Sequence, residues 1–415
     1  MTRTPDGRSV LSLFTGAGGL DLGLEAAGFQ HALCVENDED SRKTVARNRS
    51  AWRLAEPGDI HKLSPDVLLS QAGLTPGQLT LLAGGPPCQP FSKSAYWSTG
   101  DAQRLRDPRA RTLSAYLDVV RAARPQVLLL ENVKGLAYEG KDEALSLFKE
   151  GLRLINAECR TSYIPQVINL DAADYGVPQF RERVFIVASI EGRVLRMPPP
   201  THGEGAGRQP YMTAWDAIGD LDVEPWAEEL NPTGQWAALL PSIPEGKNYL
   251  WHTPRNKGQG GMPLFGWRTR YWSFLLKLSK SQPSWTIQAA PGPATGPFHW
   301  KSRLLSTREL CRLQTFPDRY EIAGVRRSAQ RQLGNAVPSA IGELFGLEIR
   351  RQLLGEPRIR RKLQLLPERR GGCPPPEPLT RVARKYHKLR AEHEDHPGPG
   401  LGPAARRRAR VDVQA

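Results

Sequence analysis

The sequence holds a cysteine, Cys88, directly behind two prolines and after the apolar run 79–83. The apolar run predicts a buried strand, and the prolines stiffen the loop that follows it. Gly84 and Gly85, before the prolines, let other groups approach closely. Because α/β sheets present catalytic groups on loops at the carboxyl ends of their strands, Cys88 is a candidate nucleophile. A lone cysteine can equally be a small buried apolar residue.

A carboxylate and two guanidiniums also lie at the ends of predicted strands. Glu131 follows the apolar run 126–130, and such a carboxylate is either solvated or held for chemistry. Gln179, Arg181 and Arg183 alternate before the apolar run 184–188, so they share one face of an extended segment. Two guanidiniums on one face suit an anion or a carboxylate, although an exposed charged strand face produces the same pattern.

A glycine-rich turn, Thr15-Gly16-Ala17-Gly18-Gly19-Leu20, joins a predicted strand to a predicted helix. Nucleotide-type cofactors are gripped in this way, because the backbone must approach the ligand closely. The spacing is not G-x-G-x-x-G, and a tight structural turn would also explain it. The next apolar run, 31–35, ends in Glu36-Asn37-Asp38. An acid there suits a ribose diol, while Asn37 or Asp38 could instead cap a helix.

An alternation of predicted strands and helices would position these candidate residues. Strands are predicted near 10–14, 31–35, 79–83, 127–130, 163–169 and 184–188. Helical stretches are predicted at 18–27, 38–48, 109–123 and 142–156. The alternation indicates a parallel sheet with helices on both faces.

Composition narrows the functional classes. The chain has 415 residues, room for two domains, and a net charge of +14, which suits an anionic partner. No signal peptide and no long apolar run are present, so we expect a soluble, intracellular protein. The five cysteines are scattered without C-x-x-C spacing, which argues against a zinc site or a disulfide framework.

Taken together, the motifs resemble those of the C5-cytosine DNA methyltransferases. The resemblance rests on their order, and it covers residues of about 10 to 350 apart from one long variable stretch. The motifs, in family order, are Phe14-Thr15-Gly16-Ala17-Gly18-Gly19, Pro86-Pro87-Cys88-Gln89, Glu131-Asn132-Val133, Gln179-x-Arg181-x-Arg183 and Gly334-Asn335-Ala336-Val337-Pro338. It implies a Rossmann-like, doubly wound, mostly parallel sheet with a smaller, irregular target-recognition domain.

The resemblance also divides the chain. It implies a catalytic S-adenosylmethionine-binding domain at 1–189, a target-recognition domain at 190–300, and a return segment at 301–355 that completes the catalytic domain. Eight of the ten tryptophans fall within 190–300, where several must serve as core. Residues 356–415 carry 15 Lys and Arg against 7 Asp and Glu and few core-forming residues, so we expect a disordered basic tail. Such a tail either adds salt-sensitive DNA affinity or only solubilises the chain.

The reaction implied is site-specific methyl transfer from S-adenosylmethionine to C5 of cytosine in double-stranded DNA, on a flipped-out base and without a metal. Cys88 would add to C6 of the base, and Glu131, Arg181 and Arg183 would support that step. The expected cofactor-binding residues are Phe14, Gly16, Gly18, Gly19, Leu20, Glu36, Asn37, Asp59, Ile60, Pro86, Leu113, Asn335 and Val337. The expected DNA-binding residues are Ser92, Lys93, Gln179, Arg255, Lys257, Arg268 and Arg270. Residues 93–106 look like a loop that closes over DNA.

Two other functions fit parts of the pattern. One family branch methylates tRNA with the same catalytic motifs, but the long variable stretch favours duplex DNA. A non-catalytic DNA-binding module would not need Cys88, Glu131 and Arg183 together. A single recognition domain without a long regulatory extension suggests a bacterial restriction–modification enzyme, which we expect to be a monomer in the nucleoid region of the cytoplasm. It would protect DNA in a restriction–modification system, with a companion endonuclease as a functional partner.

Overall fold

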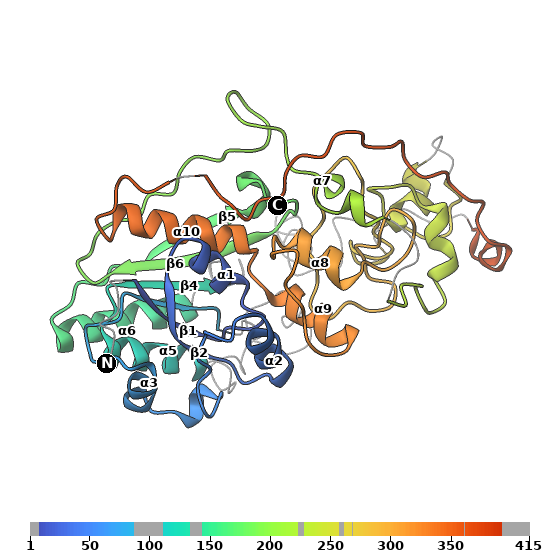
Figure 1. The fold of residues 1–415 in the computed structure, drawn as a ribbon. Coiled ribbons are helices and arrows are strands. Elements are labelled where there is room, and N and C mark those ends of the chain that lie inside the picture. Colours follow the sequence, from blue (N-terminus) through green and yellow to red (C-terminus); the bar gives the residue numbers. More distant parts are fainter. Residues whose placement is uncertain are drawn as a thin grey trace, which may run out of the picture.

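A six-stranded sheet forms the centre of the first of two lobes (Figure 1). The computed structural model describes residues 8–86, 111–132, 143–222, 228–256, 261–267, 269–360 and 362–391. The sheet has the order β2-β1-β3-β4-β6-β5. Its strands are β1 (Ser9–Leu13), β2 (Gln30–Val35), β3 (Leu81–Gly84), β4 (Val127–Asn132), β5 (Gln166–Asp171) and β6 (Glu182–Ser189).

Five strands run in one direction and β6 runs against them. β1 pairs in parallel with β2 and β3, and β3 pairs in parallel with β4. β6 is antiparallel to β4 and to β5. The short connection 172–181 between β5 and β6 has no room for a crossover helix, so the chain returns antiparallel. The predicted α/β fold with a mostly parallel sheet is therefore confirmed, with one reversed strand.

Helices cover both faces of the sheet (Figure 1). On one face α1 and α10 pack against Val10 of β1, and on the other α3, α5 and α6 pack against Leu11 and Leu13. This alternation along β1 produces two apolar layers, as expected of a doubly wound sheet. The α-helices are α1 (Gly19–Ala26), α2 (Glu39–Asn48), α3 (Pro65–Ala72), α5 (Arg111–Ala123), α6 (Glu143–Cys159), α7 (Ala214–Ile218), α8 (Thr307–Leu313), α9 (Arg326–Asn335) and α10 (Ser339–Gln352).

The last two helices return to the first lobe. A Cβ on Gly23 of α1 would lie 2.2 Å from the carbonyl oxygen of Ser339, so glycine is what lets α10 approach α1. The return segment forms two helices, α9 and α10, which are separated at 336–338. Pro338 explains the break, because it lacks an N–H and disfavours helical backbone at the residue before it.

The second lobe contains α7 and short 3-10 turns rather than long elements. Its apolar core includes Leu240, Tyr249, Phe265, Phe274 and Phe298. The expectation that tryptophans of this region serve as core holds for Trp300, which has no exposed surface, whereas Trp272 is 56% exposed.

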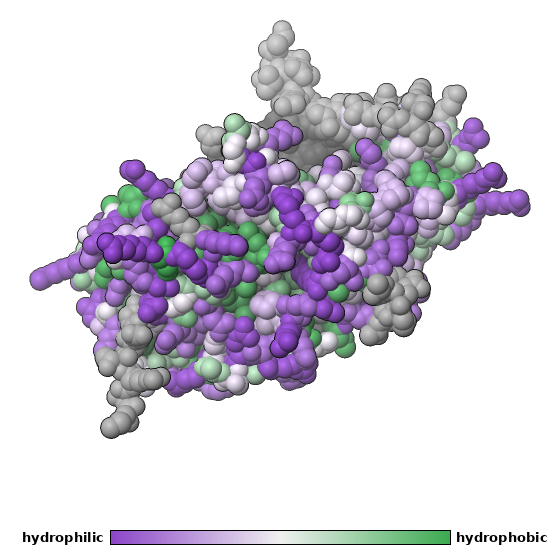
Figure 2. Space-filling model, turned by 45° about the horizontal axis from the view of Figure 1, so that its top comes forward, coloured by the Kyte–Doolittle hydropathy of each residue, from purple (hydrophilic) through white to green (hydrophobic). Residues whose placement is uncertain are grey.

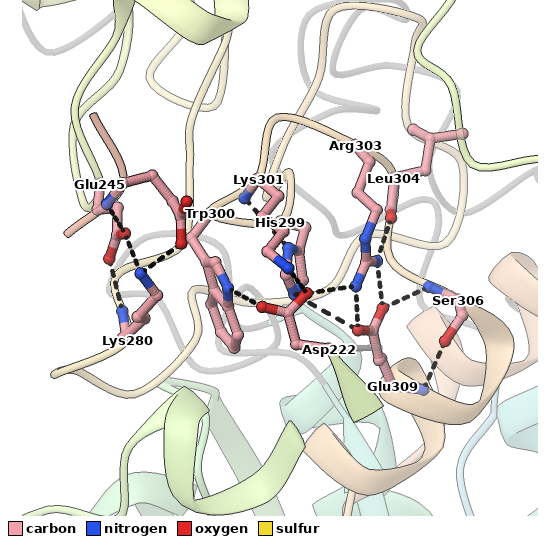
Figure 3. A network of polar contacts seen from close by, with 11 residues as sticks. Asp222, Glu245, Lys280, His299, Trp300, Lys301, Arg303, Leu304, Ser306 and Glu309 are labelled. Carbon is pink, nitrogen blue, oxygen red and sulfur yellow. Dashed lines mark hydrogen bonds and ion pairs between the residues drawn. The ribbon is translucent and has the colours of Figure 1, made fainter. Parts of the chain in front are cut away.

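A buried polar network joins the second lobe to α8 (Figure 3). Arg303 forms a two-pronged ion pair with Glu309, with hydrogen bonds of 2.8 and 2.7 Å. Glu309 also accepts from the backbone N–H of Ser306, whose hydroxyl caps the helix in return. Trp300 donates from Nε1 to Asp222 over 2.9 Å. The first turn of α8 is therefore tied to the variable region by charges as well as by apolar contacts.

Residues 356–360 and 362–391 are not the disordered tail that the composition predicted. Leu363, Leu365 and Leu366 pack against the core of the first lobe, and Tyr386 is buried in the second. Composition indicated that this segment cannot form a core of its own. Instead its apolar side chains complete cores that other elements already form.

Figure 2 shows the molecule with the top of Figure 1 turned towards the reader. Hydrophilic residues cover most of this surface, with smaller hydrophobic areas between them. Among the described residues, no helix combines the length and apolar character needed to cross a bilayer.

Candidate active site

The centre of the candidate site is an ion pair between neighbouring strands. Arg183 of β6 donates from Nε to Oε1 of Glu131, at the end of β4, over 2.9 Å. Both side chains are largely buried, with exposed fractions of 13% and 11%. Burial raises the pKa of Glu131, and the charges of Arg183 and Arg181 oppose that rise. The site therefore holds a carboxyl group that binds a proton more readily than a solvated one.

The loop that carries Cys88 begins beside this pair. A Cβ on Gly85 would lie 3.1 Å from Oε2 of Glu131, so the backbone passes close to the carboxylate. Pro86, the last described residue before the loop, is buried. Cys88 itself lies outside the described residues. It is three residues beyond Gly85, so covalent geometry limits its backbone to about 11 Å from that glycine.

Arg181 has a different environment from Arg183. It is fully buried, and its Nη2 donates to the carbonyl oxygens of Gly334 and Ala336, each over 2.7 Å. Its Nη1 donates to the carbonyl of Ile287 over 3.3 Å. We predicted a catalytic role for Arg181, and in this structure its guanidinium joins β6 to the carbonyls of the return segment and of Ile287.

Gln179, which we predicted to bind DNA, is also internal in this structure. Its side chain has no exposed surface, and its Nε2 donates to Leu313 and Gln314 over 3.2 Å each. Its Oε1 accepts the backbone N–H of Ile287 over 3.1 Å. Strand alternation put Gln179 on the arginine face correctly, but it could not indicate that segment 284–288 covers that face.

The expected cofactor residues meet at the carboxyl ends of β1 and β2. Glu36 accepts the backbone N–H of Gly16 over 2.6 Å and that of Asp38 over 2.7 Å. Each oxygen of an ionised carboxylate can accept more than one hydrogen bond, so the group retains capacity for a diol. Burial raises the pKa of Glu36, which these backbone bonds oppose.

The glycines of the turn have different tasks. Gly16 has φ +56° and a Cβ there would meet nothing within 4 Å, so the space above it is open to a ligand. A Cβ on Gly19 would lie 2.3 Å from the carbonyl oxygen of Val337, so Gly19 is needed for packing against the return segment. Gly18 has φ +80° and packs near Tyr320, and Leu20 belongs to the core beneath α1.

The remaining cofactor candidates flank this turn. Phe14, with φ +58°, and Leu113 pack against one apolar core, and Ile60 belongs to it.

A Cβ on Gly58 would lie 2.0 Å from the carbonyl oxygen of Glu36, which places the start of the Asp59 segment beside that residue. Asp59 caps a short 3-10 turn by accepting from His61. Asn37 and Asn335 are exposed. Open space at Gly16 beside an anchored carboxylate fits a cofactor with a ribose.

Asp38 and Arg42 hold Glu36 in place through hydrogen bonds to its side chain and its backbone carbonyl. Asp38 caps α2 by accepting from the backbone N–H of Ser41, so it is the helix cap that the sequence allowed. Arg42 donates to the carbonyl oxygens of Glu36 and Ala55, over 3.0 Å each. Sequence reasoning missed Arg42, because an arginine on a polar helix carries no signal of the loop it will reach.

Few of the expected DNA contacts can be placed. Ser92, Lys93, Lys257 and Arg268 lie outside the described residues, as does the side chain of Arg255. Arg270 is exposed, and its guanidinium lies 5.7 Å from the ring centre of Phe274. No group of three or more His, Cys, Asp or Glu that could hold a metal occurs in the described part of the chain.

Comparison with known proteins identifies this arrangement. The family model for C-5 cytosine-specific DNA methylase matches residues 8–351. The chain belongs to this family. It is thus an S-adenosylmethionine-dependent methyltransferase that acts on C5 of cytosine in DNA.

Its relatives cover most of its length. It is 37% identical to the type II methyltransferase M.SacI of Streptomyces achromogenes, over 83% of this chain and 93% of the relative. It is 33% identical to M.NgoFVII of Neisseria gonorrhoeae, over 79% and 83% of the two chains. A crystal structure of a putative DNA modification methyltransferase from an Escherichia coli prophage aligns with a TM-score of 0.57 at 22% identity. That alignment covers 84% of this chain and 99% of the other and supports the fold.

Proposed function

We propose that the chain methylates one cytosine within a specific sequence of double-stranded DNA, as the modification enzyme of a type II restriction–modification system. The observation that carries the proposal is the buried Glu131–Arg183 pair beside Gly85, where the loop of Cys88 begins. The names of the relatives, type II methyltransferases of bacteria, support the biological setting.

Cys88 is the proposed nucleophile. C5 of cytosine is a poor nucleophile, and covalent addition of a thiolate at C6 supplies the electron density that it lacks. The thiol must first lose its proton, which a nearby cation favours. Arg183, which pairs with Glu131 near the start of the loop, is a described residue that would provide this field.

Glu131 is the proposed proton donor to the ring. Attack at C6 moves negative charge towards N3 and O2, and a protonated carboxyl group at N3 stabilises that charge. The raised pKa of Glu131, caused by burial, supports this role. Arg183 would hold the carboxyl in place and face O2. After C5 has taken the methyl group, a base removes the C5 proton, and elimination of the thiolate gives 5-methylcytosine and restores Cys88.

The cofactor supplies a methyl group activated as a sulfonium. Glu36 would hold its ribose hydroxyls, and the open backbone at Gly16 would accept its chain. Phe14, Asn37, Asp59, Ile60, Pro86, Leu113 and Asn335 stay the proposed walls of that site, whereas Gly18, Gly19, Leu20 and Val337 shape it through packing.

The target base must leave the helix to reach this site, which costs a few kcal/mol. The second lobe is the proposed recognition domain, with residues 190–300 as its proposed limits. Arg270 is its described candidate for DNA contact, alongside Arg255, Lys257 and Arg268, and Ser92 and Lys93 belong to the proposed closing loop. We propose that the enzyme acts as a monomer in the bacterial cytoplasm, with the endonuclease as a functional partner.

Bisulfite sequencing of DNA from a host that expresses the chain tests this proposal. We expect protected cytosines at one recurring sequence, and none in cells that express Cys88→Ala. Cytosines protected without a common sequence would contradict site specificity. A host genome without protected cytosines, despite soluble and folded protein, would contradict the proposed activity.

A further inference from the structure

A segment beyond the family match joins the two lobes. The family model ends at residue 351, whereas the chain continues over both lobes as the orange-red to red ribbon of Figure 1. We define residues 362–391 as the strap. The strap is thus a continuous connection between the catalytic lobe and the proposed recognition lobe.

The strap starts from an anchor on the catalytic lobe. Glu343 of α10 has no exposed side-chain surface, and it accepts the backbone N–H groups of Gln364 and Leu365 over 2.9 and 3.0 Å. Arg360, just before the strap, pairs with the same carboxylate over 2.9 Å. Leu366 packs against the core of this lobe. A buried carboxylate that accepts several hydrogen bonds forms a fixed point.

The middle of the strap is attached to α7. Arg370 donates its backbone N–H to Asp216 over 2.8 Å, and Trp215 donates from Nε1 to the carbonyl oxygen of Gly371 over 3.3 Å. α7 also contributes Ile218 to the apolar cluster that contains Leu22 of α1 and Leu310 of α8. The strap therefore crosses the junction of the lobes while bonded to the element that lies there.

A buried ammonium group anchors the strap to the recognition lobe. Lys280 is 3% exposed, and its Nζ contacts Glu245 over 2.9 Å and Glu377 of the strap over 2.8 Å (Figure 3 shows Lys280 and Glu245). It also donates to the carbonyl of Pro375 over 2.9 Å. Burial alone would lower the pKa of Lys280, but the bonds to both carboxylates raise it. Without the strap, this cation would lose two of its three partners.

An aromatic anchor fixes the far end of the strap. Tyr386 is 4% exposed, stacks on Trp236 with ring centres 5.9 Å apart, and donates to the carbonyl of Gln235 over 2.6 Å. Val382 and Leu389 pack against the same core. The recognition lobe is thus held at two places by a segment whose other end is fixed on α10.

We propose that the strap sets the orientation of the recognition lobe relative to the catalytic lobe, with Glu377 and Tyr386 as positioning residues for DNA binding. A rotation of one lobe against the other would have to break an anchor. A strap that is bound at both ends therefore favours one arrangement before DNA arrives, which reduces the ordering cost of binding. This inference rests on the proposed function of the second lobe in DNA recognition.

The double variant Glu377→Gln/Tyr386→Ala tests the strap in the full chain. Glu368→Gln, which changes an exposed carboxylate of the strap, and Tyr386→Phe, which keeps the ring, are matched controls. We expect the dissociation constant for duplex DNA that contains the target site to rise at least tenfold in the double variant. Titration calorimetry should show a dissociation constant for S-adenosylmethionine within twofold of wild type. Both controls should bind DNA within threefold of wild type.

Limited trypsin digestion reports whether the strap has been released, because arginines and lysines flank Tyr386. Faster cleavage near residues 381–390 with unchanged DNA affinity and turnover would overturn the proposal. An equal loss of cofactor and DNA affinity would also overturn it, since this would indicate general destabilisation. If the double variant does not fold, Glu377→Gln alone must weaken DNA binding selectively for the proposal to stand. A wild-type chain that methylates no DNA would contradict the proposed function itself and not the strap.

Discussion

Arg183 donates from Nε to a carboxylate oxygen of Glu131 over 2.9 Å, across the antiparallel pair of β6 and β4. The two residues stand 52 positions apart in the sequence, and the reversal of β6 is what brings them together. The pair shares one end of the sheet with Gly85 and with Glu36 of the cofactor turn. The proposed chemistry depends on this convergence.

Replacing Glu131 by glutamine should remove the proton donor and leave the pocket nearly unchanged in size. We expect kcat to fall by about 10²- to 10⁴-fold, the usual contribution of general acid catalysis. DNA affinity, measured by gel shift, should change little. A variant that keeps more than half of the wild-type rate would exclude Glu131 from the chemical step.

The raised pKa of Glu131 predicts a pH dependence. Burial stabilises the protonated form, so this residue keeps its proton at a pH where a solvated glutamate has lost it. The rate should therefore fall as the pH rises through the pKa of folded Glu131. Stability should follow the same sign, since a pKa raised by folding stabilises the native state at low pH and ceases to do so at high pH. Single-turnover rates across pH should show this decline in wild type and not in Glu131→Gln.

Gly16 and Gly73 form a matched pair for testing the cofactor site. Both have positive φ, +56° and +68°, and a Cβ on either meets nothing within 4 Å. Alanine at either position should cost about 1–2 kcal/mol of stability through its left-handed backbone. Only Gly16→Ala should also weaken S-adenosylmethionine binding, by at least tenfold in calorimetry. Equal affinities in the two variants would contradict the placement of the cofactor over Gly16.

Glu36→Ala should weaken the cofactor without a comparable effect on DNA. The backbone N–H groups of Gly16 and Asp38 would lose the carboxylate that accepts their hydrogen bonds, and the ribose would lose its acceptor. We expect a loss of cofactor affinity of at least tenfold and a change in DNA affinity of less than threefold. Calorimetry that shows the larger loss on the DNA side would remove Glu36 from the cofactor site.

Arg181→Met should act mainly through stability. The carbonyls of Gly334, Ala336 and Ile287 would lose a buried donor, and unsatisfied buried groups cost about 1–3 kcal/mol each. Thermal unfolding should occur at a clearly lower temperature. If unfolding is unchanged while kcat falls, Arg181 has a catalytic contact that its carbonyl bonds do not reveal.

Local patterns in the sequence predicted most of the strands and part of the candidate site. Apolar runs located β1, β2, β3, β4 and β6, and the strand predicted at 163–169 overlaps β5. The residues after two of these runs located Glu36 and Glu131. The patterns did not reveal contacts made by distant segments. Segment 284–288 covers Gln179, the carbonyl of Val337 meets Gly19, and the cores of both lobes bind the strap. Strand periodicity describes which face a side chain occupies, but it holds no information about what packs on that face.

Covalent trapping tests the central claim most directly. A duplex with 5-fluorocytosine at the methylated position found by bisulfite sequencing is incubated with the protein and S-adenosylmethionine, then denatured. We predict a protein–DNA adduct that survives denaturation in wild type and is absent from Cys88→Ala, because fluorine at C5 cannot leave as a proton. Absence of the adduct with active wild-type protein, or its persistence in Cys88→Ala, would contradict attack by Cys88 on the base.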